Sequence, residues 1–187
     1  MTDPLLFLLA ILSLLLTPGP TNTLLATSGA AAGLRVAARL VPAELLGYSA
    51  SVGLLATLLV ALRGSGLQLD AGLRVGAALY LLLLAWNLWR HSRALDEGRL
   101  PIGPRQVFVT TLLNPKGLVM ATLLPASGGL ATTAPYLALL AASIAGCGLS
   151  WVALGAFLRR RIPAAARVLG RVGSVVLVGF AAILLVR

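Results

Sequence analysis

Long apolar segments alternate with short polar connections along the whole chain. An α-helix needs about 20 apolar residues to cross the roughly 30 Å hydrocarbon core of a bilayer. Six segments approach or exceed this length, at about 4–32, 41–62, 73–90, 107–125, 135–157 and 169–186. No polar stretch is long enough to fold alone. The pattern therefore predicts an all-α polytopic membrane protein with six transmembrane helices, forming a single integral membrane domain over 1–187.

The first apolar segment is too long for one straight crossing, and the sequence Thr-Pro-Gly-Pro at 17–20 interrupts it. Proline removes a backbone donor and clashes with the preceding turn, so two prolines here break the helix. A membrane tolerates broken backbone only where protein surrounds it or a polar cavity adjoins it. The break at 17–20 thus predicts two half-helices that meet at a site. A second break, Asn-Pro-Lys-Gly at 114–117, interrupts the fourth segment.

The two breaks are related by an internal repeat. A shift of 97 residues carries 17–20 onto 114–117, and it carries the Arg-Val-Gly at 74–76 onto 171–173. The same shift superposes the first three apolar segments on the last three without a gap. This predicts two halves of similar structure, each of which opens with an interrupted helix.

Each predicted half contains three spans, so the second half must be inverted in the membrane relative to the first. The halves are about 1–90 and 107–187, joined by a cytoplasmic loop at 91–106. Paired interrupted helices in inverted repeats indicate the midplane binding site of a secondary transporter. The repeat therefore favours transport, with the site where the two breaks meet.

Charge is scarce and strongly basic. Only 11% of residues are charged, against roughly 25% in soluble domains, and the net charge is +10. The connections after the first, third and fifth segments carry eleven arginines, and the other side carries Arg63, Arg74 and Arg187. Positive loops stay in the cytoplasm, which places both termini outside it. We attribute the basic balance to this rule and expect no nucleic-acid partner.

The residue types at the breaks indicate an anion-binding site. Thr17 and Asn114 each precede a proline and are good N-cap residues, so each break should start a half-helix. Helix N-termini carry unpaired N–H groups and partial positive charge, and Lys116 adds a full charge, which suits a carboxylate. Glycines beside the prolines let backbone approach a ligand closely. The predicted substrate-binding residues are Thr17, Pro18, Gly19, Pro20, Asn22, Asn114, Pro115, Lys116 and Gly117.

Glu44 has two interpretations. An acid in the first turn of the second span is stabilised by the helix dipole alone. Alternatively, Glu44 contributes to proton coupling or contacts a substrate amine. Cys147 and His91 are the chain's single cysteine and single histidine, and no intramembrane carboxylate pair is present. We therefore predict no enzyme activity, no cofactor and no metal site.

The break motifs resemble those of a known family. Leu-Leu-Thr-Pro-Gly-Pro at 15–20 together with Asn-Pro-Lys-Gly at 114–117 is similar to the lysine exporter and homoserine/threonine resistance family (LysE/RhtB type). The Gly-Ala-Ala-Leu-Tyr-Leu run at 76–81 resembles the third-span signature of that family. The resemblance implies a multi-pass exporter of amino acids or related small metabolites in the bacterial inner membrane. It also implies coupling to the proton gradient and a homodimer.

Two function classes follow from these patterns. The first is a secondary exporter that works by alternating access around the two breaks. The second is a non-transporting membrane subunit, in which the breaks are packing kinks and the Gly/Ala stripes serve assembly. Two such stripes are visible: Gly29 with Gly33, and Ala142 with Gly146 and Ser150, all at four-residue spacing.

Overall fold

The computed structural model describes residues 3–61, 70–93, 95, 102–125, 129–162 and 164–186. Within these residues the chain is all-helical. The helices are α1 (Pro4–Leu16), α2 (Pro20–Ala32), α3 (Leu34–Ala37), the 3-10 turn η1 (Ala38–Leu40), α4 (Val41–Ala61), α5 (Asp70–Arg90), α6 (Pro104–Leu112), α7 (Lys116–Leu123), α8 (Gly129–Arg161) and α9 (Ala165–Val186). Arg63, Arg99 and Arg187 lie outside the described residues.

The helices coincide with the apolar segments, with shifts at their ends. Asp70, expected in a loop, is the first residue of α5, and α8 begins at Gly129 although 126–134 was expected to be a connection. The predicted loop boundary there was wrong because Pro135 is accommodated inside α8. At the start of α6 the Gln106 side-chain oxygen accepts from the Gly103 N–H, and the helix begins at Pro104, inside the predicted loop 91–106.

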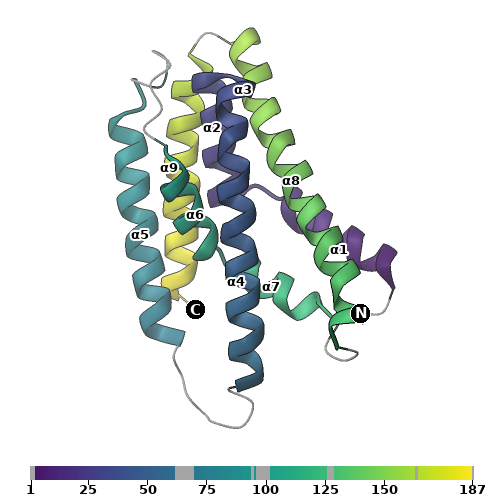
Figure 1. Cartoon of the computed structure of the whole chain (residues 1–187). Coiled ribbons are helices and arrows are strands. Elements are labelled where there is room, and N and C mark those ends of the chain that lie inside the picture. The colour runs from purple at the N-terminus through teal and green to yellow at the C-terminus, as the bar shows by residue number, and fades with distance from the viewer. Residues whose placement is uncertain are drawn as a thin grey trace.

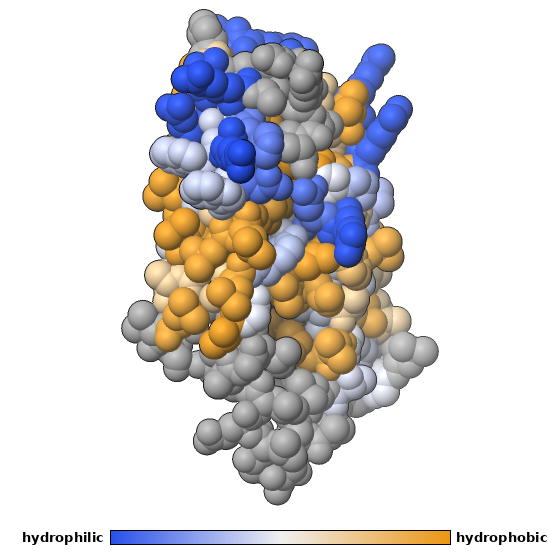
Figure 2. Space-filling view, turned by 90° about the vertical axis from the view of Figure 1, so that its left-hand side faces the viewer, coloured by the Kyte–Doolittle hydropathy of each residue, from blue (hydrophilic) through white to orange (hydrophobic). Residues whose placement is uncertain are grey.

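Within the residues that the structure describes, two helices are long and apolar enough to cross a membrane, within Ala131–Arg161 and Ala165–Ile183. The pair α1 and α2 makes a third candidate span, bent by 61° at the first break. Large apolar side chains such as Leu83, Trp86 and Val175 are well exposed on the outer surface. Exposed apolar side chains on long apolar helices are compatible with a lipid surround. Figure 2 shows a broad band of hydrophobic residues on one face of the molecule.

The helices form an upright bundle with α1 and α7 projecting to one side at its lower end (Figure 1). Helix α2 is almost wholly buried and packs against α8 and α9. A Cβ on Gly29 would collide with the Val152 carbonyl, and one on Gly155 would collide with the Ala26 carbonyl. The α2 and α8 backbones therefore touch, an approach that only glycine permits.

The other predicted small-residue positions behave differently. Gly33 does not pack: it ends α2 with φ of 81°, a left-handed conformation that favours glycine. Ala142, Gly146 and Ser150 are exposed on α8, and a Cβ on Gly146 would meet nothing within 4 Å. This stripe does not pack within the described part of the chain, because α2 contacts the opposite face of α8.

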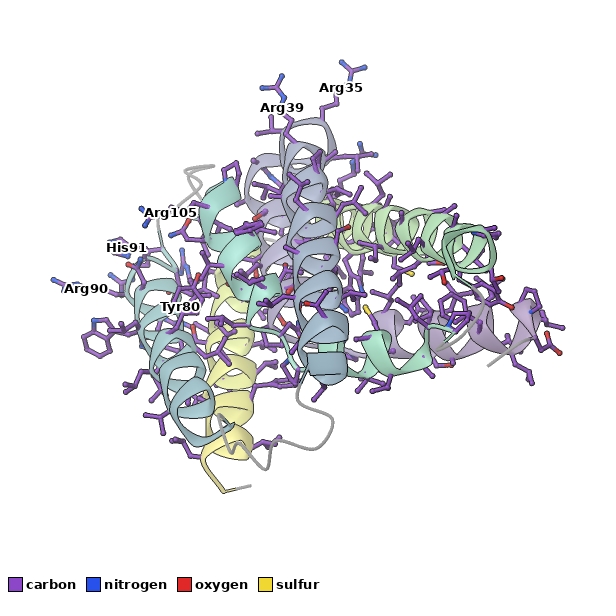
Figure 3. All side chains as sticks on the ribbon, turned by 60° about the horizontal axis from the view of Figure 1, so that its bottom comes forward. Arg35, Arg39, Tyr80, Arg90, His91 and Arg105 are labelled. Atoms are coloured by element: carbon purple, nitrogen blue, oxygen red, sulfur yellow. The ribbon has the colours of Figure 1, made fainter. Side chains whose placement is uncertain are left out.

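Arginines gather at one end of the bundle. Figure 3 shows Arg35, Arg39, Arg90 and Arg105 pointing outward around that end. The C-terminus of α8, with its three arginines, and the start of α9 reach the same end in Figure 1. Figure 2 shows the resulting hydrophilic cap above the apolar band. The fold thus collects the arginines that the sequence places in alternate connections.

The buried side chains form two clusters. One lies among α2, α4, α5 and α9 and includes Leu25, Leu81 and Leu177. The other lies where α1, α4, α7 and α8 meet, and includes Phe7, whose ring stacks edge-on against Tyr136 at 5.1 Å. Helices α4 and α8 contribute to both clusters, and the two helix breaks lie at their junction.

Candidate functional site

The first break is set by the alternation of prolines. A residue before proline avoids the helical region, so Thr17 and Gly19 are both extended. Helix α1 therefore ends at Leu16, and α2 cannot begin before Pro20, with Gly19 as its N-cap. The prediction that Thr17-Pro18 starts the half-helix was wrong. Thr17 instead closes α1, since its N–H donates to the Ser13 carbonyl at 3.3 Å.

This correction changes the polarity of the first break. The end of α1 presents the backbone carbonyls of Leu15 and Thr17, which carry partial negative charge. Asn22, from the first turn of α2, donates its amide to both carbonyls, at 2.6 and 2.9 Å. Trp151 of α8 also donates to the Leu15 carbonyl, at 3.3 Å. Asn22 thus ties the two half-helices together across their bend.

The second break follows the prediction closely. The Asn114 side-chain oxygen accepts from the Lys116 N–H at 3.1 Å, and its carbonyl accepts from the Gly117 N–H at 2.9 Å. Pro115 already has helical angles, φ of −60° and ψ of −18°, although α7 is assigned from Lys116. Asn114 therefore makes the side-chain bond expected of an N-cap residue.

A buried set of polar side chains joins the two breaks, and we name Thr21, Tyr48, Thr111 and Asn114 the polar cluster. The Asn114 amide donates to the Thr21 hydroxyl at 3.2 Å and to the Tyr48 hydroxyl at 3.1 Å. The Thr21 and Thr111 hydroxyls are 3.1 Å apart. The cluster therefore links α2, α4, α6 and the second break, which are distant in sequence.

Lys116 makes the most direct connection between the breaks. Its side chain is buried, and its ammonium donates to the Thr17 carbonyl at the end of α1. A Cβ on Gly19 would lie 3.2 Å from both Nζ and Cε of Lys116, so Gly19 leaves room for this side chain. One break thus supplies the cation and the other supplies the acceptor.

Glu44 lies in the interior. It falls in the first turn of α4, as expected, and its side chain is only 1% exposed. The carboxylate is within electrostatic range of Lys116 and of Cys147. Among the described residues its Oε2 has no hydrogen-bond partner. This oxygen faces Gly148 of α8, where a Cβ would collide with it.

The structure brings most of the predicted site residues together. Thr17, Gly19, Asn22, Asn114 and Lys116 converge as described. Pro20 is buried at the first position of α2, whereas Pro18 is exposed and Pro115 is half-buried. Gly117 has a different role from the predicted one. A Cβ there would collide with the Ser51 hydroxyl, so Gly117 accommodates α4 rather than a ligand.

Tyr48 and Thr111 were not predicted from the sequence. Tyr48 lies four residues after Glu44, on the same face of α4, and this spacing was the available signal. Thr111 lies among apolar residues just before the second break and gave no such signal. Among the described residues no group of three or more His, Cys, Asp or Glu could hold a metal ion. Comparison of the chain with family models, curated proteins and solved structures found no match.

Proposed function

We propose that the chain is a secondary exporter of amino acids or related small metabolites, driven by the proton gradient, of the lysine exporter and homoserine/threonine resistance type. The observation that carries this proposal is the contact between the two helix breaks. The buried Lys116 ammonium of one break donates to the Thr17 carbonyl of the other. A buried cation whose hydrogen bond, among the described residues, goes to a backbone carbonyl is a counter-charge that a substrate carboxylate could engage.

The packing of the helices supports an inverted repeat. The breaks in the backbone, at 17–19 and 113–115, agree with the 97-residue shift to within one residue. Each broken helix packs against the middle helix of the other half: α2 against α8, and α6 with α7 against α4. The last helices of the halves, α5 and α9, pack against each other. Such reciprocal packing is what a pseudo-two-fold axis between six spans would produce.

The chemistry of the site suits a zwitterionic substrate. We infer that the Lys116 ammonium binds a carboxylate, while Asn114 holds the polar cluster beside it. The unpartnered oxygen of Glu44 and the Thr17 carbonyl then face an ammonium group. A substrate carboxylate would draw Lys116 away from Thr17 and so release the contact between the two breaks. Glu44, within electrostatic range of Lys116, is the residue to which we assign proton uptake.

The arginine-rich end supports an orientation in the bacterial inner membrane. With that end in the cytoplasm, both termini lie on the outer side. We also propose that the chain forms a homodimer, as the family resemblance implies.

Transport by the purified chain tests the proposal. The chain is reconstituted alone into proteoliposomes, and counterflow of a panel of labelled amino acids is measured with and without a pH gradient. Lys116→Met removes the charge at similar volume. Thr122→Val on the exposed face of the same helix is the control, because the Thr122 hydroxyl bonds only within α7.

We expect substrate-dependent counterflow and a loss of at least about tenfold in Lys116→Met, since a charged hydrogen bond contributes about 1.5–3 kcal/mol. Thr122→Val should transport as the original chain does. Equal transport by Lys116→Met and Thr122→Val would show that Lys116 does not bind the substrate. An original chain that moves no member of the panel would favour the non-transporting subunit.

A further inference from the structure

A narrow apolar groove runs between α5 and α9 on the outer surface. It has a volume of about 450 Å³ and is lined by Leu82, Ala85, Trp86, Trp89, Ser174, Val175 and Val178. Its single polar side chain is already satisfied, because the Ser174 hydroxyl donates to the Gly170 carbonyl at 2.9 Å. The groove therefore offers a ligand only apolar contact along its length. This size and lining are typical of sites that bind elongated apolar groups.

Cationic side chains lie at one end of this groove. Among the side chains that the structure describes, none lies at the other end. Arg171 lies one turn above Ser174 on α9, and its guanidinium stacks over the Trp89 ring at 5.6 Å from the centroid. Arg90 follows Trp89 as the last residue of α5 and points away from the bundle (Figure 3). The groove thus leads from an apolar floor at Leu82 and Val178 up to two exposed arginines.

We propose that this groove binds one anionic glycerophospholipid, with an acyl chain between α5 and α9 and the phosphate between Arg90 and Arg171. The polarity of the groove matches such a molecule, which is apolar along its tail and negative at its head. The proposal rests on the membrane orientation proposed above, which puts this end at the cytoplasmic leaflet, where anionic lipids attract basic side chains. It does not depend on the transported substrate.

The shape of the groove favours a lipid tail over a second copy of the chain. Helices that associate in membranes present small residues, so that their backbones approach closely. Here Trp86 and Trp89, 65% and 50% exposed, flank the opening and would hold a neighbouring helix away. An acyl chain is thin enough to lie between these rings and α9.

Lipid retention by the purified protein tests the proposal. The delipidated full chain is mixed with phosphatidylglycerol or phosphatidylcholine of identical acyl chains, and bound lipid is counted by native mass spectrometry. The double variant Arg90→Gln/Arg171→Gln removes the head-group contacts. Arg35→Gln/Arg39→Gln removes the same charge from the same end of the bundle, away from the groove. Val175→Trp fills the groove from its exposed side.

We expect the original chain to bind phosphatidylglycerol more tightly than phosphatidylcholine. Each arginine near a membrane surface contributes about 1 kcal/mol, so the groove double variant should lose about 30-fold in phosphatidylglycerol affinity. The Arg35/Arg39 control should lose less than about twofold, and Val175→Trp should weaken both lipids. Equal binding of the two lipids to the original chain, or equal losses in the two double variants, would overturn the proposal.

A photoreactive phosphatidylglycerol provides a second measurement. With a diazirine in its acyl chain, it should label peptides that contain 82–89 and 174–178. Labelling spread evenly over the exposed apolar surface would overturn the proposal, and so would a crosslink from Trp86 to a second copy of the chain.

Discussion

Replacing Gly148 with alanine should displace the Glu44 carboxylate from its place against α8. A Cβ at this position would collide with Oε2 of Glu44 and would lie 3.5 Å from Leu25. Glu44 is 1% exposed, so its side chain has little room to retreat. Gly146, two residues away on the same helix, meets nothing, which makes Gly146→Ala a matched control.

The two alanines should change stability in opposite directions. Overpacking costs about 1–3 kcal/mol, and replacing a helical glycine by alanine returns at most about 1 kcal/mol. With the full propensity gain subtracted, Gly148→Ala should therefore destabilise the protein by up to about 2 kcal/mol, a fall of as much as roughly 8 °C in Tm. Gly146→Ala should raise Tm by about 2–4 °C, since only the helix-propensity gain applies.

Thermal unfolding in detergent and counterflow in proteoliposomes measure the two consequences. Gly148→Ala should lose transport as well as stability, and Gly146→Ala should keep transport. Adding Glu44→Asp to Gly148→Ala shortens the acid by one methylene and should recover part of the lost stability. If both single variants have the same Tm, or if Glu44→Asp recovers nothing, Gly148 does not act through the Glu44 carboxylate.

Three further predictions concern packing and burial at the breaks. Gly155→Ala should lower the free energy of unfolding by at least about 3 kcal/mol, because its Cβ would collide with the Ala26 carbonyl of the buried α2. The yield of folded protein in size-exclusion chromatography should fall accordingly. A yield equal to that of Gly146→Ala would contradict the close approach of the α2 and α8 backbones. Asn114→Leu should cost about 1–3 kcal/mol for each group left without its partner, namely the Tyr48 hydroxyl and the Lys116 N–H. Asn114→Asp keeps an oxygen that can accept from the Lys116 N–H, so in thermal unfolding it should lower stability less than Asn114→Leu does. A larger loss of stability in Asn114→Asp would contradict the N-cap role of Asn114. Cys147 is only 7% exposed. A fluorescent maleimide, followed by gel fluorescence, should therefore label it at least about tenfold more slowly than a cysteine that replaces Gly146 in a Cys147→Ala background. Equal labelling rates would contradict the burial of Cys147.

Most residues of the predicted site lie close together, but the polarity predicted for the first break was wrong. Lys116, Asn114 and Asn22 converge as expected, because prolines at fixed positions force breaks whatever surrounds them. The polarity of the first break depended on which of two prolines begins the helix. Pro18 and Pro20 both restrict the residue before them, so only Pro20 can start α2, and Thr17 became the carbonyl end of α1.

Burial was the property that local sequence could not provide. Glu44 looks the same in the first turn of a helix whether it is solvated or buried. Its environment is decided by Lys116 and Gly148, which lie on α7 and α8. The same holds for the small-residue stripes, since Gly29 faces the Val152 backbone while Gly146 faces outward.

The sequence by itself determined the helices, the two breaks, the scarcity of charge and the alternation of arginine-rich connections. These features follow from local physics: apolar length, proline geometry and the cost of burying charge. Only the tertiary structure decided that the breaks meet, that Lys116 reaches the Thr17 carbonyl and that Tyr48 and Thr111 complete the polar cluster. Those contacts join residues 60 or more positions apart, so they depend on how α2, α4, α6 and α8 pack, which no local pattern specifies.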